Sequence, residues 1–218
     1  METTPVGRSR MQALLLTLFV CFAVTPFFEG KWVADVTGTV VIIAAFGAAS
    51  TTKADFAVVL VLAALAICTI WQTYWWPSTM AGYLAISSDL AFVGLVIVLL
   101  LSYVFRARGT TRETIAAASC AYLLIGLMWA DVFSLLEGST PGSFSPIEAQ
   151  GSAINILSPR ELVARFNYFS FTTLSTVGYG DIVPLSRPAR SLATFEAISG
   201  QLYIAVLISR LVGQSTGK

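Results

Sequence analysis

Six long apolar stretches restrict the folds open to this chain more than any other feature of its sequence. The hydrocarbon core of a bilayer is about 30 Å thick, so a helix needs about 20 mostly apolar residues to cross it. The stretches that reach or approach this length are 11–28, 32–50, 55–76, 80–105, 113–136 and 189–212. The sequence therefore predicts an all-α integral membrane protein with six transmembrane helices.

The composition agrees with this fold class and argues against several functions. Hydrophobic residues make up 56% of the chain and charged residues 11%, whereas soluble domains carry about 25% charged residues. A net charge of +1 argues against a nucleic-acid partner, which needs a strongly basic face. Histidine is absent and the cysteines form no CxxC pair, so we expect neither an enzyme nor a resident metal or cofactor.

The distribution of Lys and Arg predicts the orientation, because cytoplasmic loops carry an excess of these residues. With a cytoplasmic N-terminus, eight of them lie inside: Arg8, Arg10, Lys53, Arg106, Arg108, Arg112, Arg210 and Lys218. Five then lie outside: Lys31, Arg160, Arg165, Arg187 and Arg190. We therefore expect a multi-pass protein of the cell (plasma) membrane, with a cytoplasmic N-terminus, 1–10, and a short cytoplasmic tail, 213–218.

The connector after the fifth stretch contains a predicted short helix. Its first part, 137–157, is rich in turn residues and is expected to be an extracellular loop. Ser158, Pro159 and Glu161 then supply an N-cap, a proline at the first helical position and a glutamate three residues after the cap. A helix over 158–175 is too short to span a bilayer, so we expect it to be re-entrant.

The sequence Thr-Val-Gly-Tyr-Gly-Asp, 176–181, follows this helix directly. Irregular backbone at membrane depth is tolerated only where it is buried in protein or lines a watery path. Gly178 and Gly180 can adopt backbone conformations that other residues avoid. Their alternation with Val177 and Tyr179 allows successive carbonyl groups to face one axis. A potassium ion that sheds its water needs such a stack of oxygens, and the Thr176 hydroxyl can supply the innermost one.

Segment 168–184 and the following helix resemble the potassium channels of the tetrameric pore-loop superfamily. The resemblance implies a homotetramer around one pore and a pore domain over 113–212, with outer helix 113–136, pore helix 158–175, filter 176–181 and inner helix 189–212. It implies that K⁺, the permeant ion, binds to the carbonyl groups of the filter residues and to the Thr176 hydroxyl. These filter residues are Thr176, Val177, Gly178, Tyr179 and Gly180. Thr172, Thr173, Ser175 and Asp181 are the expected filter supports.

Two positions depart from the family's pattern. Thr172 stands where several bacterial channels have an acidic residue that bonds to the Asp after the filter, which puts an acid-pair mechanism of filter inactivation in doubt. Tyr168 and Phe169 replace a frequent Trp-Trp pair, which leaves one phenol as a hydrogen-bond donor toward the filter.

The sixth stretch holds two candidate gating residues, each with two interpretations. Gly200 stands where related inner helices often carry a hinge glycine, but a small residue also serves close helix packing. Glu196 lies inside the span, where a carboxylate is a functional-site hypothesis by default. The alternative, which we favour, is a structural hydrogen bond from Glu196 to a pore-helix group such as Thr172 or Thr173.

The first four stretches form a predicted four-helix bundle, 11–105, that lacks the charges of a voltage sensor. The fourth stretch, 80–105, contains no Lys or Arg, and its one charged residue is Asp89. We expect Asp89 to be buried against Thr37 or Thr39. Steep voltage dependence needs several mobile charges per subunit, so the cluster of arginines past the inner end of this stretch predicts a membrane anchor.

Two other acidic residues, Asp35 and Asp131, are expected near the outer membrane interface. We expect no soluble regulatory domain in this chain, because few residues lie before the first stretch or after the sixth. We therefore predict a potassium-selective channel that conducts K⁺ passively and is not steeply voltage-gated. The alternatives are a poorly selective cation channel on the same fold, which a filter lacking one of its residues would favour, and a membrane transporter, which needs repeated halves with broken helices.

Overall fold

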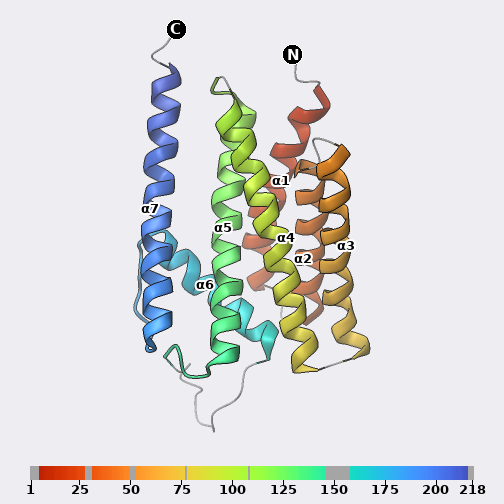
Figure 1. Cartoon of the computed structure of the whole chain (residues 1–218), viewed down its shortest axis with the longest axis vertical. Helices are drawn as coiled ribbons and strands as arrows, with labels where there is room; N and C mark the ends of the chain where they lie inside the picture. Colours follow the sequence, from red (N-terminus) through yellow and green to blue (C-terminus); the bar gives the residue numbers. More distant parts are fainter. Residues whose placement is uncertain are drawn as a thin grey trace.

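The chain folds as a bundle of α-helices, as the sequence predicts (Figure 1). The computed structural model describes residues 5–27, 31–49, 53–76, 78–107, 109–145 and 158–215. Its helices are α1 (Pro5–Val24), the short 3-10 helix η1 (Thr25–Phe27), α2 (Lys31–Ala49), α3 (Lys53–Trp75), α4 (Thr79–Arg106), α5 (Arg112–Ser139), α6 (Pro159–Leu174) and α7 (Arg187–Ser215). Parts of the predicted N-terminus, extracellular loop and tail lie outside the described residues, as does Arg108.

Five helices in the described ranges are long and apolar enough to cross a membrane. The apolar windows are Trp32–Ala49, Phe56–Trp75, Thr79–Arg106, Arg112–Ser139 and Arg187–Arg210. In α1 the apolar part is shorter, Arg10–Ala23. The protein is therefore a multi-pass membrane protein, and the sixth span, expected over 11–28, stays a prediction.

Of the four N-terminal helices, α1 and α4 pack directly against α5 of their own chain, and α2 and α3 pack on α1 and α4. One buried core joins α1 to α5 and contains Leu14, Ile42, Val59, Val96 and Leu124. Small residues of α5, such as Ala117 and Ala121, are fully buried in it, and small side chains allow helices to approach closely. The Cys120 thiol of α5 lies 3.7 Å from the Met11 carbonyl oxygen of α1. The bundle thus sits directly beside the helix that leads into the pore loop.

The expected partners of Asp89 are wrong. Thr37 and Thr39 donate hydrogen bonds to carbonyl oxygens of their own helix, at 2.8 and 2.7 Å. Asp89 instead interacts electrostatically with Asp131 of α5. Asp131 is 3% exposed, so it is buried between helices, and its expected position near the outer membrane interface stays a prediction. Which residues of α4 and α5 face each other depends on how the two helices are rotated. The sequence of one helix alone does not predict that rotation.

The short helix α6 packs against both α5 and α7. In Figure 1, α6 slants beside α5 and α7 and reaches only part of the way along them. The two ends of the chain lie at the same end of the bundle (Figure 1). This agrees with termini on one side of the membrane, and the side itself stays a prediction.

Candidate functional site

The start of α6 is fixed by a capping box, which confirms the prediction from Ser158, Pro159 and Glu161. The Glu161 amide donates to the Ser158 hydroxyl oxygen at 3.4 Å, and the Ser158 amide donates to the Glu161 carboxylate at 2.7 Å. Pro159 occupies the first helical position, where a missing amide hydrogen costs nothing. At 16 residues the helix is about 24 Å long, so it enters the bundle without traversing it.

The end of α6 holds the beginning of the filter segment through the backbone. The Thr176 amide donates to the Thr173 carbonyl at 3.0 Å. The amides of Val177 and Gly178 donate to the Thr172 carbonyl at 2.9 and 3.1 Å. Carbonyl groups in the last turn of a helix have no partner within the helix, so here they serve as anchors for the loop. Thr172 and Thr173 thus contact the filter through main-chain oxygens.

The side chains at this helix end turn back to their own helix. The Thr172 hydroxyl donates to the Phe169 carbonyl at 2.9 Å, and the Ser175 hydroxyl donates to the Phe171 carbonyl at 2.5 Å. These bonds reinforce the last turn of α6. They leave Thr172 without the side-chain bond to Asp181 that an acidic residue makes in related channels.

The filter segment alternates between two backbone conformations. Thr176, Gly178 and Gly180 have positive φ angles of 61°, 54° and 81°, a region that L-residues other than glycine rarely adopt. Among the hydrogen bonds between described residues, none ends on a carbonyl oxygen of 176–180. Five successive backbone acceptors are therefore available to a ligand.

Tyr168 takes the place of the missing acidic partner of Asp181. A hydrogen bond from the Tyr168 hydroxyl lowers the pKa of the Asp181 carboxyl, and the Ile182 amide supports the same carboxylate at 3.0 Å. The same interaction raises the pKa of the Tyr168 phenol. The Tyr168 ring also lies parallel to that of Tyr179 in the filter, with centroids 6.3 Å apart. The sequence indicated a phenol donor at this position, and its acceptor is Asp181.

A cluster of aromatic side chains supports the filter from behind. Phe133 of α5, Phe144, and Phe166 and Phe169 of α6 are buried and make mutual edge or tilted ring contacts, with centroids 4.6 to 6.3 Å apart. Such contacts stabilise beyond simple burial of area. The cluster fixes α6 against α5, and with it the filter that α6 holds.

The chain after the filter is held by the segment that follows α5. The Ser145 amide donates to the Val183 carbonyl at 2.8 Å, and the Val183 amide donates to the Ser145 hydroxyl oxygen at 3.0 Å. The Leu185 amide donates to the Ser143 carbonyl at 2.8 Å. Arg165 of α6 donates to the Ser145 carbonyl. Sequence reasoning missed this support, because serines in a turn-rich loop carry no signal of a distant partner.

Glu196 is fully buried, and it bonds to the pore helix as favoured, but the partner differs from the expected one. Its Oε1 lies 2.5 Å from the Ser170 hydroxyl oxygen, which also lies 2.7 Å from the Gly126 carbonyl oxygen. The expectation of Thr172 or Thr173 as partner is wrong, because Glu196 bonds to Ser170 and the Thr172 hydroxyl donates to a carbonyl group of its own helix. Three helices, α5, α6 and α7, meet at this one hydroxyl.

Gly200 lies where α7 passes the end of α6. A Cβ atom at Gly200 would lie 2.6 Å from the Leu174 carbonyl oxygen, which is closer than real side chains come. The close approach supports the packing interpretation of this glycine. A hinge role stays a prediction.

The first turn of α6 also contacts the four-helix bundle. Asp35 of α2 is 6% exposed and pairs with Arg160 of α6. Asp35 is therefore buried under the first turn of α6, and its expected position near the outer membrane interface stays a prediction. The Cβ position of Gly82 on α4 would lie 2.6 Å from the Pro159 ring, so α4 also approaches the beginning of the pore helix closely.

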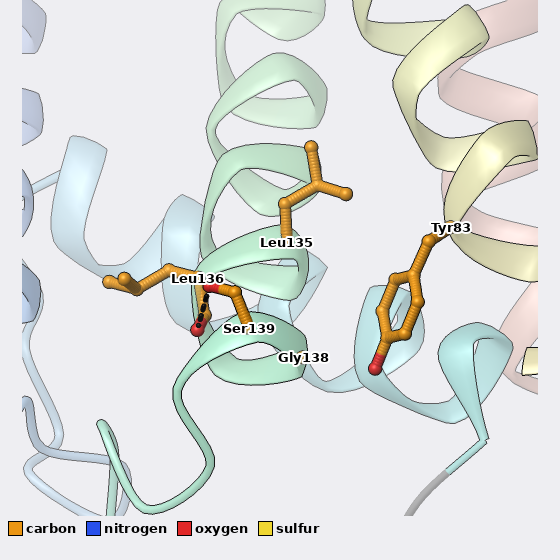
Figure 2. A pocket seen from close by; sticks show the side chains of 5 residues that line it. All are labelled: Tyr83, Leu135, Leu136, Gly138 and Ser139. Atoms are coloured by element: carbon orange, nitrogen blue, oxygen red, sulfur yellow. Dashed lines mark hydrogen bonds between the residues drawn. The ribbon is translucent and has the colours of Figure 1, made fainter. Parts of the chain in front are cut away.

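A pocket opens elsewhere, where the beginning of α4 meets the end of α5 (Figure 2). Its lining residues are Tyr83, Leu135, Leu136, Gly138 and Ser139. None of them belongs to the pore helix, the filter or α7. The candidate site in the backbone of 176–180 is therefore separate from this pocket.

Comparison with known proteins gives a family match that contains the filter segment, and several partial matches to single proteins. Residues 160–214 match the "Ion channel" family. A segment of 68 residues is 35% identical to the inward rectifier potassium channel Kirbac3.1 of Paramagnetospirillum magnetotacticum, and covers 31% of this chain and 23% of that protein. A segment of 46 residues is 48% identical to the voltage-gated potassium channel Kch of Escherichia coli (strain K12). It covers 21% of this chain and 11% of that protein.

A longer match extends beyond the pore region. Over 132 residues the chain is 29% identical to the protein LctB of Bacillus caldotenax. This match covers 57% of this chain and 95% of that protein. By contrast, the matches cover less than a quarter of the length of Kirbac3.1 and of Kch.

Proposed function

We propose that this protein, an ion channel by its pore domain and not an enzyme, conducts K⁺ selectively and passively across the cell membrane. The observation that carries the proposal is the filter backbone, with positive φ at every second residue and no hydrogen bond to a carbonyl oxygen of 176–180. A dehydrated K⁺ ion needs a column of such oxygens. The similarity to two proteins named as potassium channels supports this choice of ion.

In this proposal each residue of the filter contributes through its main chain. The carbonyl groups of Thr176, Val177, Gly178, Tyr179 and Gly180, with the Thr176 hydroxyl, replace the water shell of K⁺. Thr172, Thr173 and Ser175 hold the innermost end of this column, and Asp181 holds the outer end through Tyr168. No covalent bond is made or broken, and no cofactor other than the permeant ion takes part.

Four copies of the chain surround one pore in the proposed assembly. A single chain supplies one strand of carbonyl oxygens, whereas an ion requires oxygens on all sides. The apolar side chains around the filter and along α7 are exposed in one chain: Val177, Tyr179, Phe195, Ile198 and Leu202 are 51 to 72% exposed. Contact with neighbouring copies and with lipid accounts for this exposure.

The direction of α6 favours a cation at the inner mouth of the filter. The carbonyl end of a helix carries about half a negative elementary charge. In α6 this end lies at Leu174, next to Thr176, where the filter begins. Four such ends aimed at a central cavity attract K⁺ before it enters the filter.

Gating in this proposal does not use a charged fourth helix. The sequence of α4 contains one basic residue, Arg106, at its last position, and one acidic residue, Asp89. In the proposed orientation, with both termini cytoplasmic, Arg106 lies at the inner membrane surface, where anionic lipid attracts it. The bundle 11–105 then supports the pore domain 113–212 without sensing voltage steeply.

The test of the proposed function is a measurement of selectivity on the reconstituted protein. In planar bilayers with K⁺ on one side and Na⁺ on the other, we expect the current to reverse near the K⁺ equilibrium potential. Ba²⁺, which is similar in radius to K⁺ but doubly charged, should block. A reversal potential near zero would identify a poorly selective cation channel, and solute movement coupled to a gradient would identify a transporter.

A further inference from the structure

Three oxygen atoms from three helices meet behind the filter. The Ser170 hydroxyl oxygen of α6 lies 2.7 Å from the Gly126 carbonyl oxygen of α5 and 2.5 Å from Oε1 of Glu196 on α7. Ser170 and Glu196 are both 0% exposed. Both distances are within hydrogen-bond range, so each contact requires a hydrogen atom between its oxygens.

The number of hydrogen atoms at this junction decides which group donates. A serine hydroxyl has one hydrogen to donate, and a backbone carbonyl oxygen has none. If Ser170 donates to Gly126, the contact with Glu196 has a hydrogen only when the carboxyl group supplies it. If Ser170 donates to Glu196, two bare oxygens face each other at the distance of 2.7 Å. Only a protonated Glu196 satisfies both contacts.

The surroundings of Glu196 favour the same protonation state. Its second carboxyl oxygen, Oε2, is buried and has no hydrogen-bond partner in the described part of the chain. An ionised carboxylate without water, cation or full hydrogen bonding is strongly disfavoured. The titratable group that faces it from α5 is Tyr122, which interacts with it electrostatically. From α6 it meets the neutral Ser170 hydroxyl, and no ion pair involves Glu196 within the described ranges.

We propose that Glu196 is a neutral carboxylic acid whose O–H donates to Ser170, and that the directed chain from Glu196 through Ser170 to Gly126 locks the pore helix between the inner and outer helices. This inference rests on the proposed function, because it makes conduction conditional on the proton of Glu196. Glu196 acts here as a positioning residue. It touches no ion and works through the helix that holds the filter.

The position of Ser170 explains how the loss of one proton reaches the filter. Ser170 lies one turn before Leu174, whose carbonyl oxygen is in close contact with Gly200. The turn between Ser170 and Leu174 carries the carbonyl groups of Thr172 and Thr173, which accept hydrogen bonds from the first three filter amides. An ionised Glu196 takes the single hydrogen of Ser170 and turns the Gly126 contact into a repulsion between oxygens. The pore helix then loses this bond to the Gly126 carbonyl of α5. We expect the pore helix to shift, and the filter amides that it holds to move with the helix.

The experiment compares the parent with Glu196→Gln in the reconstituted full chain. A glutamine amide donates to Ser170 as the neutral acid does, but it cannot ionise. We expect K⁺ flux through the parent to fall reversibly as the pH is raised on both sides, and flux through Glu196→Gln to stay constant over the same range. Glu137→Gln is the matched control: this carboxylate accepts from the Gly142 and Phe144 amides and has no contact with Ser170, so the variant should keep the alkaline loss of the parent.

Infrared difference spectra between the parent and Glu196→Gln supply a second readout that does not depend on conduction. We expect the carbonyl stretch of one protonated carboxyl group in the parent at neutral pH, and its loss at alkaline pH. The same alkaline loss of flux in Glu196→Gln, or the absence of the protonated carboxyl band, would overturn the inference. If the parent passes no K⁺ at any pH while the band is present, the proposed function fails and the protonation of Glu196 stands.

Discussion

The guanidinium group of Arg160, in the first turn of the pore helix α6, lies 3.1 Å from the Asp35 carboxylate on α2. The same carboxylate oxygen accepts a hydrogen bond of 2.6 Å from the Tyr74 hydroxyl of α3, and the guanidinium lies 4.8 Å above the Tyr74 ring. Arg160 also donates to Thr73 of α3. The four-helix bundle therefore has a structural task, which is to hold the first turn of the pore helix.

The ion pair leads to a prediction about stability. Asp35→Asn removes the charge that Arg160 needs, and hydrogen bonds to charged groups contribute about 1.5–3 kcal/mol. We expect the purified protein to lose stability in this range, as measured by thermal unfolding. Arg187→Gln, at an exposed arginine outside this contact, is the control and should change little. In a double-mutant cycle, Arg160→Gln should cost less in the Asp35→Asn background than in the parent, because only its contacts with Thr73 and Tyr74 remain to be lost. Full additivity of the two losses would contradict the pairing.

The filter glycines lead to a prediction about conduction. Gly178 has φ of +54°, and a Cβ atom in this region costs about 1–2 kcal/mol. Gly178→Ala should therefore abolish K⁺ flux in liposomes. Gly142, with φ of +84°, lies in the turn after α5 and outside the filter. Gly142→Ala meets the same backbone strain and should retain the flux, so an equal loss in both variants would argue that folding, and not filter geometry, is affected.

The N-cap of the pore helix leads to a prediction about the assembly. Ser158→Ala removes a capping oxygen and should cost about 1 kcal/mol per subunit. If four chains assemble, the melting temperature of the purified assembly should fall measurably. Ser209→Ala is the control, because this exposed hydroxyl bonds only within its own helix, to the Ala205 carbonyl. An unchanged melting temperature for Ser158→Ala would count against the importance of the cap.

The hydrogen bond between Tyr168 and Asp181 leads to a prediction about external pH. It lowers the pKa of Asp181, so its contribution to filter stability is present above the ordinary Asp range and is lost as the pH falls through the lowered value. Tyr168→Phe should raise this pKa, and the loss of conductance on external acidification should begin at higher pH than in the parent. Tyr83→Phe, remote from the filter, is the control. If the conductance of Tyr168→Phe and that of the parent fall over the same acidic pH range, the proposed role of this bond is wrong.

The arginines that follow α4 lead to a prediction about voltage. Joint neutralisation of Arg106, Arg108 and Arg112 should reduce expression or disturb the topology, because these residues anchor the inner end of the helix. Any correctly inserted protein should keep the shallow conductance–voltage curve of the parent. If the parent activates steeply and the inserted variant does not, these arginines are a sensor and the anchor interpretation is wrong.

The sequence alone predicts those structural features that depend on residues close together in the chain or on the membrane as solvent. Apolar length predicts the membrane helices because each backbone group in lipid must bond within its own segment. Ser158, Pro159 and Glu161 predict the start of α6 because a capping box forms between residues three apart. The alternating glycines after α6 predict an irregular backbone for the same local reason.

Features that depend on the rotation of one helix against another were decided only by the tertiary structure. Ser170 and Thr172 are two positions apart, which is about 200° around a helix, so only one of them can face Glu196. Thr173 lies closer to the face of Ser170, but its position along the axis differs by about 4.5 Å. The pairing of Asp35 with Arg160 likewise joins residues far apart in the chain. Hydropathy and spacing carry no information on axial offset and rotation, and packing between the helices sets both.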